Sequence, residues 1–216
     1  MQSTVVIADD HPLYREALIG SIVKQLPELT LLESADYLSL FDMLKEQRDE
    51  IDLVLLDLSM PGCQGYSGLI FIKKYFPEIP VLIITAHNSA EIMSQCQLFN
   101  ADGFVSKTAS SDTIVSKISH LLESDDVLSP QLNMAALAQQ EQLRYHKVMQ
   151  LTPHQFHILS LVADGLLNKQ IAAQLEISEK TVKAHLSKIF KILDVGNRTQ
   201  AAKFVAGLAL TTSWQH

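Results

Sequence analysis

The chain has 216 residues and a formal net charge of −7. Its composition, 47% hydrophobic and 19% charged, is that of an ordinary globular protein and excludes an intrinsically disordered chain. Cys63 and Cys96 form no CxxC pair, so neither a disulfide framework nor a structural zinc site is expected, and a reducing cytosol fits. The first residues lack the pattern of a signal peptide, and no apolar run approaches the ~20 residues that span a bilayer. We therefore expect a cytoplasmic protein with no membrane partner.

Charge is distributed unevenly along the chain. From residue 151 onward, seven lysines and arginines stand against four acidic residues, a net charge of +3. Because the whole chain carries −7, the residues before 151 carry −10. An acidic first part and a basic second part indicate two domains with different partners.

The first 125 residues alternate short apolar runs with amphipathic stretches. Strands are expected over 4–8, 29–33, 52–57, 80–85 and 103–106, and helices near 12–26, 38–49, 66–76, 89–100 and 111–124. Strands that are apolar nearly throughout and alternate with helices are typical of a parallel sheet with both faces covered. We expect an α/β domain over 1–125.

The rest of the chain changes character twice. Residues 126–149 are rich in glutamine and have no strong core pattern, apart from a possible helix over 133–143, and we interpret them as a linker. Residues 150–216 show only helical patterns, over about 153–163, 168–175, 179–192 and 199–210. An all-α second domain is therefore expected.

Three carboxylates, a hydroxyl and an ammonium follow the predicted strands of the first domain. Asp9 and Asp10 end the first strand, Asp57 and Thr85 end the third and fourth, and Lys107 follows the fifth. In an open parallel sheet the carboxyl ends of the strands meet at one edge, where ligands bind. Any one of these aspartates alone is better explained as a helix or loop cap. Agreement among four strand ends favours a site.

The chemistry of this edge points to a metal ion and to phosphoryl transfer. Clustered carboxylates repel one another unless a cation lies between them, and an all-oxygen acidic site suits Mg²⁺. Lys107 adds a fixed positive charge, and a carboxylate among such groups can act as a nucleophile toward phosphorus. His11 is interpreted as a loop or helix-start residue without a catalytic role, and the two cysteines as passive.

Four motifs in this half, "IADDH", "LLDLSMPG", "IITA" and "GFVSK", resemble in order and spacing the signature blocks of a response-regulator receiver domain. The resemblance implies a flavodoxin-like, doubly wound sheet of five parallel strands in the order 2-1-3-4-5. It also implies that Asp57 accepts phosphate from a histidine kinase, and that Mg²⁺ is bound by Asp9, Asp10, Asp57 and the carbonyl of Ser59. Lys107 would contact the phosphoryl group, and Thr85 and Phe104 would form the switch. Receivers often have proline where this chain has Thr108.

The helix expected over 179–192 has two distinct faces. Its inward positions are apolar, and lysines with small residues crowd its outer face. A short helix, a three-residue turn and this basic helix describe a helix-turn-helix, whose second helix enters the major groove of DNA. A solvated lysine face is the alternative, but the crowding of the lysines on one side and the net charge of +3 favour DNA.

This half resembles the LuxR-type DNA-binding domain over about 150–210. The matching stretches are "LT", "ILSLVADGLLNKQIAAQLEIS", "TVKAHLSKIFKIL" and "RTQA". The resemblance implies a reader helix over 179–192, a last helix that mediates dimerisation, and binding of double-stranded DNA as a homodimer. The residues expected at the DNA are Lys169, Lys180, Thr181, Lys183, Ala184, His185, Ser187, Lys188 and Lys191.

Two positions depart from the LuxR pattern. His154-Gln155 stands where arginine-glutamate is common, which is expected to remove an ion pair within the domain. Glu176 stands where a small residue, often glycine, is common, which puts a negative charge near the turn. Together the two halves resemble a NarL/FixJ-type response regulator over nearly the whole chain.

Three functions are compatible with this combination of domains. The first is a two-component transcription regulator whose DNA binding is controlled by phosphorylation of Asp57, and it is preferred. The second is a phosphorylation-independent DNA-binding protein, which the complete set of acidic, hydroxyl and lysine residues disfavours. The third is a phosphatase, which would need a second acid to protonate the leaving group and would leave the basic half unexplained. On the preferred interpretation the protein is not an enzyme, beyond catalysing its own phosphoryl transfer and dephosphorylation.

Overall fold

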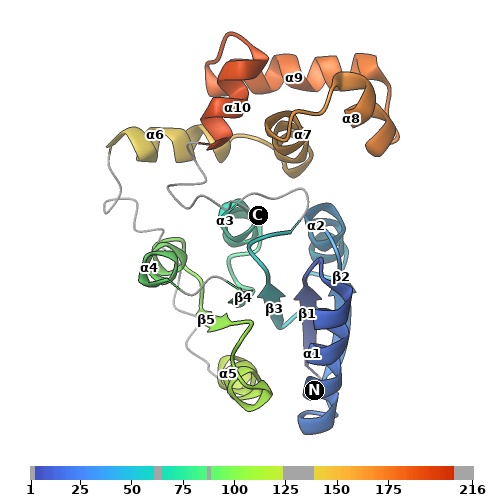
Figure 1. Cartoon of the computed structure of the whole chain (residues 1–216), viewed down its shortest axis with the longest axis vertical. Helices are drawn as coiled ribbons and strands as arrows, with labels where there is room; N and C mark the ends of the chain where they lie inside the picture. The colour runs from blue at the N-terminus through green and yellow to red at the C-terminus, as the bar shows by residue number, and fades with distance from the viewer. Residues whose placement is uncertain (1–2, 61–64, 87–88, 124–138, 207–216) are drawn as a thin grey trace. The chain divides into compact units, whose positions relative to one another are not determined.

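The structure is a computed structural model, and it describes residues 3–60, 65–86, 89–123 and 139–206. It divides into two compact units, Met1–Asn133 and Met134–His216 (Figure 1). No helix among the described residues is both long enough and apolar enough to cross a bilayer.

The first unit is built on one parallel sheet. Its strands are β1 (Thr4–Ala8), β2 (Thr30–Ser34), β3 (Leu53–Leu56), β4 (Val81–Thr85) and β5 (Gly103–Ser106). They lie in the order β2-β1-β3-β4-β5, and every neighbouring pair is parallel. This confirms the five-stranded, doubly wound α/β fold expected from the sequence.

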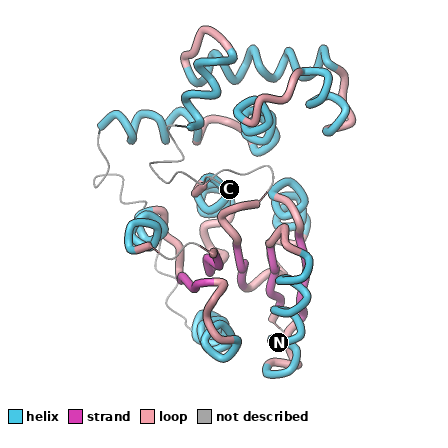
Figure 2. Tube along the Cα trace, in the orientation of Figure 1, coloured by secondary structure: helices cyan, strands magenta, loops and turns pink. Residues whose placement is uncertain are grey.

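Five helices cover the two faces of this sheet. They are α1 (Pro12–Gln25), α2 (Tyr37–Glu46), α3 (Ser67–Tyr75), α4 (Ala90–Leu98) and α5 (Ser111–Glu123). Helices α1 and α5 lie on one face, and α2, α3 and α4 lie on the other (Figures 1 and 2). Strands such as β3, whose four residues are all buried, are apolar throughout because helices cover both of their faces.

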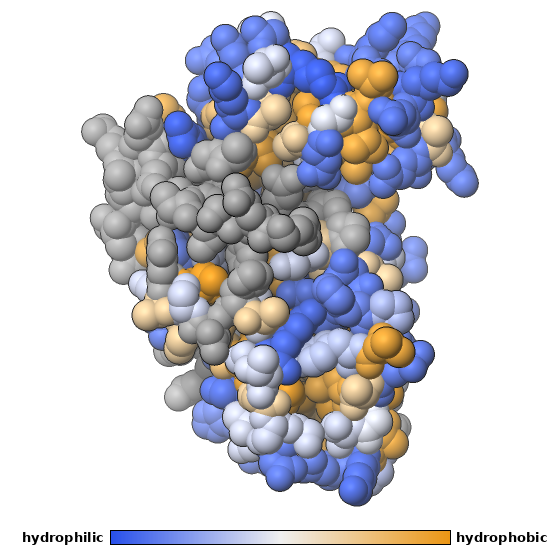
Figure 3. Space-filling model, viewed as in Figure 1, coloured by the Kyte–Doolittle hydropathy of each residue, from blue (hydrophilic) through white to orange (hydrophobic). Residues whose placement is uncertain are grey.

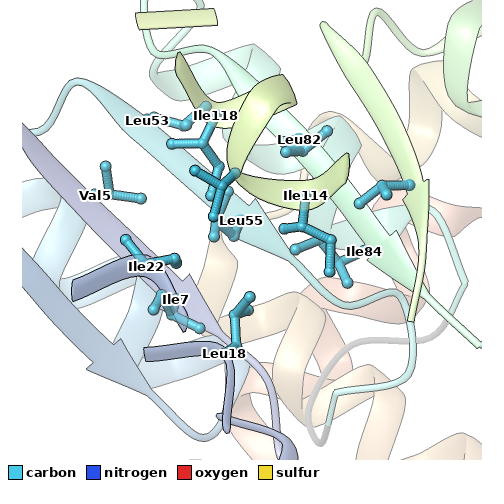
Figure 4. Packing of buried hydrophobic residues seen from close by; sticks show 12 residues of the cluster. Val5, Ile7, Leu18, Ile22, Leu53, Leu55, Leu82, Ile84, Ile114 and Ile118 are labelled. Atoms are coloured by element: carbon cyan, nitrogen blue, oxygen red, sulfur yellow. The ribbon is translucent and has the colours of Figure 1, made fainter. Parts of the chain in front are cut away.

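The core under α1 and α5 comes from alternate strand residues. Val5 and Ile7 of β1 point to this face, and they pack with Leu18 and Ile22 of α1 (Figure 4). Ile114 and Ile118 of α5, which covers the same face of the sheet as α1, belong to the same cluster. Burying each such side chain contributes about 1.5–3 kcal/mol to the free energy of unfolding, so this cluster fixes α1 and α5 on the sheet.

Backbone hydrogen bonds carry the strand register one residue past the strand ends. The amide of Asp57 donates to the carbonyl of Ala8 at 2.9 Å, and the amide of Asp9 donates to Ser34 at 3.1 Å. At the other side of the sheet, the amide of Lys107 donates to the carbonyl of Thr85 at 2.8 Å. The residues that follow the strands are therefore held in register at one edge of the sheet.

The second unit is entirely helical in its described part. Its helices are α6 (Gln139–Val148), α7 (Pro153–Ala163), α8 (Asn168–Gln174), α9 (Glu179–Leu193) and α10 (Arg198–Ala206). Its core is formed by buried apolar residues of α7, α8 and α9, among them Phe156, Leu159, Ile171, Val182, Leu186 and Ile189. This arrangement agrees with the all-α second domain expected from the sequence.

Helix α6 occupies part of the stretch that was expected to be a linker. The ammonium of Lys147 donates to the carbonyl of Leu193 at 2.9 Å, which ties the end of α6 to the end of α9. Residues 126–138 and the expected end of the last helix, 207–210, lie outside the described residues. The boundaries 1–125, 126–149 and 150–216 therefore stay predictions.

Side-chain caps start two helices of this unit. The hydroxyl of Thr152 accepts from the amide of Gln155, and the side chain of Gln155 accepts from the amide of Thr152, which forms a capping box. Ser178 caps α9 by accepting from the amide of Thr181 at 3.0 Å. Gln155 therefore has a structural role, although it departs from the glutamate that the family pattern favours.

The turn between α8 and α9 contains a residue in left-handed backbone geometry. Glu176 has a φ of 53°, a region that glycine adopts readily and that costs other residues about 1–2 kcal/mol. This explains in physical terms why a small residue, often glycine, is favoured at this position of the turn.

We expect Glu176→Gly to raise the free energy of unfolding of the helical unit by about 1 kcal/mol, because it relieves the left-handed strain. Glu176→Ala is the matched control, since it removes the same charge but keeps a Cβ at this φ. Urea unfolding followed by circular dichroism measures both variants. Equal stabilisation by glycine and alanine would attribute the effect to charge and contradict the strain explanation.

Candidate functional site

The carboxylates at the sheet edge converge on one ammonium group. The Nζ of Lys107 lies 2.8 Å from Oδ2 of Asp57 and 2.7 Å from Oδ2 of Asp9. Asp57 and Asp9 are buried, and the Lys107 side chain is only 13% exposed. The structure thus joins β1, β3 and the residue after β5 through one cation, at the edge where the sequence predicted a site.

Asp10 and His11 complete the acidic cluster. Carboxylate or imidazole atoms of Asp9, Asp10, His11 and Asp57 lie within 4.8 Å of one another, a spacing that suits a metal ion. Oδ1 of Asp10 is buried without a hydrogen bond of good geometry, although Nδ1 of His11 lies 2.7 Å away. Three carboxylates this close to one another fit a divalent cation with oxygen ligands.

Burial and charge shift the acid–base properties of this pair. Burial raises the pKa of Asp57 above its ordinary value, and the hydrogen bond from Lys107 opposes this rise without cancelling it. For Lys107, burial acts to lower the pKa, but the hydrogen bonds and charges of Asp57 and Asp9 outweigh it and the pKa is raised. Lys107 therefore stays protonated at neutral pH, which a fixed positive charge at this edge requires.

Two residues of α1 that are absent from the predicted site contact it. The ammonium of Lys107 lies 4.9 Å from the ring centroid of Tyr14, which is within cation–π range. Burial, together with the charges of Asp9 and Asp57, raises the pKa of Tyr14 to about 12. The guanidinium of Arg15 donates to the carbonyl of Asp9 at 2.6 Å and to Glu33 at 2.8 Å. Their position in the first turn of a helix that follows Asp9-Asp10 is the signal that could have identified them.

The other predicted residues of this edge lie near the same strand ends. Thr85 is fully buried at the end of β4, and Phe104 is partly buried within β5. Ser59 follows Asp57 by two residues, and its backbone amide hydrogen-bonds the Asp57 carboxyl group. The structure therefore brings a hydroxyl group and an aromatic ring onto strands next to the acidic cluster.

The residues predicted to contact DNA lie on exposed positions of the helical unit. Eight of the nine are exposed: Lys169, Lys180, Thr181, Lys183, Ala184, Ser187, Lys188 and Lys191. Among the described residues, none of the lysines in this set forms an ion pair with an acidic side chain. All but Lys169 lie on α9, whose buried side is formed by Val182, Leu186, Ile189 and Leu193. A lysine surface without acidic partners is suited to phosphate groups.

His185, the ninth residue, is only partly exposed. Its ring centroid lies 5.3 Å from that of His154 at the start of α7, and its Nδ1 is buried without a hydrogen-bond partner. Burial lowers the pKa of His185, and the charges of His154 and Lys188 lower it further. His154, which replaces the arginine common in the family pattern, thus packs against His185 of α9.

An arginine of α10 ties the loop before α8 to the rest of this unit. The guanidinium of Arg198 donates to the carbonyl of Leu166 and lies within hydrogen-bond distance of Asn168, at 3.4 Å. This is the arginine of the "RTQA" motif. Although this motif lies outside the helix-turn-helix, its arginine thus holds the loop that precedes α8.

Comparison with known proteins gives the family of the chain. Residues 5–119 match the response regulator receiver domain, and residues 149–205 match the bacterial regulatory proteins of the luxR family. The chain is a response regulator. More precisely, it belongs to the response regulators that join a receiver domain to a LuxR-type DNA-binding domain.

Relatives match this response regulator over almost its whole length. It is 37% identical to the glycerol metabolism activator of Pseudomonas putida over 204 residues, which cover 91% of this chain and 92% of the relative. It is 30% identical to the nitrate/nitrite response regulator protein NarL of Escherichia coli K12, over 94% of both chains. Both matches extend over the receiver and the LuxR-type domain of this chain, as expected for a two-domain transcriptional regulator.

Solved structures share the fold of the response regulator. The RcsB response regulator of Salmonella typhimurium is 23% identical, with a TM-score of 0.52, over 96% of this chain and 100% of that chain. The receiver domain of NarL from Mycobacterium tuberculosis is 27% identical, also with a TM-score of 0.52, over 57% of this chain and 98% of that one. The likeness confirms the fold of the receiver and the presence of a helical second domain.

We expect Asp57→Asn to be more stable than the wild type at pH 7 in the presence of EDTA. A raised folded-state pKa means that the protonated carboxyl group favours the fold, and that this stabilisation is lost as the pH rises through the folded pKa. Asparagine is neutral at every pH, so the variant keeps the stability that the wild type loses when Asp57 ionises. The advantage should disappear at pH values below the ordinary pKa of aspartate, as measured by urea unfolding across a pH series. A constant advantage at all pH values would contradict this explanation.

Proposed function

We propose that Asp57 is the phosphoacceptor of this response regulator, and that its phosphorylation by a histidine kinase controls DNA binding by the helical unit. The observation that carries the proposal is the contact of Lys107 with both Asp57 and Asp9, beside a third carboxylate. A carboxylate that faces a cation is an oxygen nucleophile placed where negative charge on phosphorus can be offset.

In the proposed reaction, an oxygen of Asp57 attacks phosphorus and the bond between phosphorus and the nitrogen of the phosphohistidine breaks. The imidazole of the kinase leaves with the electron pair of that bond. Lys107 would move from its contact with the carboxylate to the phosphoryl oxygens, where its charge stabilises the transition state. Hydrolysis of the aspartyl phosphate would return the carboxylate, and we propose no other enzymatic activity.

We propose that Mg²⁺ is the cofactor of this step. Asp9, Asp10, Asp57 and the carbonyl of Ser59 would hold the ion, and the closeness of the three carboxylates, whose ligand atoms lie within 4.8 Å of one another, supports this assignment. When bound, Mg²⁺ supplies positive charge that offsets the three carboxylates and the phosphoryl oxygens. Asp9 would then contribute both to the ion and to the orientation of Lys107.

We propose that Thr85 and Phe104 convert the chemical change into a conformational one. Thr85 is buried one strand away from Asp57, and its carbonyl accepts from the amide of Lys107 at 2.8 Å. A shift of Thr85 toward a phosphoryl group would therefore act on the segment that carries Lys107. Phe104, partly exposed on β5, has room to change its exposure in response.

For the helical unit, we propose that α9 reads the major groove of double-stranded DNA. The exposed lysines of α9, without acidic partners among the described residues, support this role. Lys169, from the start of α8, would contact the phosphate backbone beside the groove, while His185 would act mainly by packing against α7. Binding as a homodimer would match two half-sites related by a two-fold axis. Such a regulator acts where the DNA is, so we assign it to the cytoplasm.

The phosphoacceptor is tested with acetyl phosphate, Mg²⁺ and intact-mass spectrometry. The wild-type chain is expected to gain one phosphate, because Asp57 is the proposed nucleophile. Asp57→Ala and EDTA-treated wild type should gain none. Asp42→Ala, which removes an exposed aspartate of α2, is the control and should be labelled like the wild type. Undiminished labelling of Asp57→Ala would refute the assignment.

The reader helix is tested with Lys183→Ala in the full chain, on a selected DNA site and on random duplex. If Lys183 contacts a base edge, the variant should lose about 1–3 kcal/mol of binding free energy on the selected site only. If it contacts only phosphate, both duplexes should be affected alike and the slope of log K against log salt should fall by about 0.9.

Lys188→Ala is the companion variant on α9, and Lys45→Ala on α2 of the receiver is the matched control. The control removes one exposed lysine without touching the proposed reader and should bind both duplexes as the wild type does. Wild-type binding by both α9 variants, at every salt concentration, would exclude α9 as the reader.

A further inference from the structure

One of the neighbours of the Lys107 ammonium is an aromatic ring. Its Nζ lies 2.8 Å from Oδ2 of Asp57 and 2.7 Å from Oδ2 of Asp9. The centroid of the Tyr14 ring lies 4.9 Å from the same Nζ. Nδ1 of His11 lies 3.5 Å away, at the limit of a hydrogen bond, on a side chain that is 63% exposed. The two carboxylates therefore hold the ammonium by charge, and the ring face of Tyr14 attracts it through its quadrupole.

The ring of Tyr14 is neutral at neutral pH. Burial raises the pKa of Tyr14 to about 12, and the charges of Asp9 and Asp57 contribute to the rise. Because the hydroxyl group keeps its proton, the contact with Lys107 is a cation–π contact and not an ion pair with a phenolate. The ring face alone therefore provides the attraction.

The first turn of α1 holds this ring in place. Pro12 is the first residue of the helix and fixes the backbone there. Tyr14 packs against the core cluster under α1 and α5. The guanidinium of Arg15, the next residue, donates to the carbonyl of Asp9 at 2.6 Å and to Glu33 at 2.8 Å. These contacts fix the ring relative to the edge of the sheet.

The hydroxyl group of Tyr14 is buried and has no hydrogen-bond partner within the part of the chain that the structure describes. A buried hydroxyl group without a partner is destabilising, and phenylalanine would fill the same space without that cost. The Lys107 side chain is only 13% exposed, so it is largely withdrawn from the surface of the receiver, where Figure 3 shows polar and apolar side chains interspersed. The contact between ring and ammonium is thus an internal one that does not need the hydroxyl group.

The contact with the ring gains importance when the carboxylates bind a metal ion. The carboxylates of Asp9 and Asp57 that hold Lys107 are among those proposed to bind Mg²⁺. A carboxylate shared with a divalent cation attracts the ammonium less, and the two cations repel each other. The ring of Tyr14 offers no oxygen ligand of the kind that Mg²⁺ prefers, so its attraction for Lys107 is unchanged.

We propose that Tyr14 is a positioning residue for phosphorylation, whose ring holds the ammonium of Lys107 beside Asp57 while the metal ion occupies the carboxylates. This inference rests on the proposed function, in which Asp57 is the phosphoacceptor and Lys107 stabilises the transition state. Tyr14 acts through Lys107 and touches neither the phosphoryl group nor the metal ion. A charge that is already in place needs no reorganisation at the moment of reaction, which is why holding the ammonium speeds phosphoryl transfer.

Tyr14→Leu in the full chain removes the ring face and keeps an apolar side chain against the core. It should slow labelling by acetyl phosphate and Mg²⁺, followed by intact-mass spectrometry, by about threefold to tenfold. Tyr14→Phe should be labelled at the wild-type rate and should melt at a higher temperature, because it keeps the ring and removes the unpartnered hydroxyl group. Ile22→Val, which removes a methyl group from the core under the same helix, is the matched control for lost packing and should be labelled like the wild type.

A graded series at position 14 separates the electrostatics of the ring from its shape. Phenylalanine that carries one, two or three ring fluorines, incorporated in place of Tyr14, has less electron density on the ring face and nearly the same volume. The logarithm of the labelling rate should fall steadily as fluorines are added, because the attraction for the ammonium weakens. A flat or rising series would show that the ring only fills space and would overturn the inference.

The position of Lys107 gives a readout that does not depend on phosphorylation. Protons that lie over an aromatic ring are shifted upfield in NMR spectra, so the ε-methylene protons of Lys107 should resonate upfield of those of other lysines. Saturation with Mg²⁺ should leave this shift in place, Tyr14→Phe should keep it and Tyr14→Leu should remove it. Loss of the shift when Mg²⁺ is added would mean that the ammonium leaves the ring, which contradicts the inference.

The outcomes separate this inference from the proposed function. If the wild type is labelled at Asp57 and Tyr14→Leu is labelled equally fast, the positioning role is overturned while the phosphoacceptor stands. If the wild type gains no phosphate, or if Asp57→Ala is labelled like the wild type, the role of Asp57 is refuted, and the inference that rests on it fails as well.

Discussion

The contact of Lys107 with Asp57 and Asp9 is the interaction on which the acidic site depends. Three carboxylates at one sheet edge repel one another, and the Lys107 ammonium, 2.8 Å and 2.7 Å from two of them, offsets that repulsion. The contact needs β1 beside β3, with the segment after β5 reaching the same edge. The strand order β2-β1-β3-β4-β5 supplies this arrangement, and the apolar core under α1 and α5 keeps the strands in register.

Helix α1 links this site to two other parts of the receiver. Its inner side, through Leu18 and Ile22, belongs to the core, and its first turn places Tyr14 and Arg15 beside Lys107 and Asp9. A change of charge at the site therefore acts on residues that are rigidly connected to the whole helix. On the outer side of the same helix, Leu13 and Val23 are exposed to solvent.

The helical unit keeps its geometry at positions that depart from the family pattern. Gln155 forms the capping box of α7 as a glutamate would, because its side-chain oxygen reaches the same amide. His154 stands where the family pattern has an arginine, and its ring contacts that of His185. Glu176 adopts a left-handed backbone conformation in the turn. Buried apolar residues of α8 and α9, such as Ile171 and Val182, hold the two helices on either side of it. Helix α9 thus remains packed against α7 and α8 although these positions differ in chemistry from the family pattern.

The sequence by itself determined the α/β class, the strand order that the receiver motifs imply, the aspartates at the strand ends and the lysine face of α9. It could do so because these features follow from local periodicity and from the rule that parallel strands end at one edge. Only the tertiary structure decided which side chains meet across long separations. The cation–π contact of Tyr14, the pairing of buried Lys73 with Asp102 at 2.5 Å and the inward turn of His185 belong to this group. Such contacts depend on how whole elements pack, because the residues involved lie far apart in the chain and no local pattern specifies their separation in space.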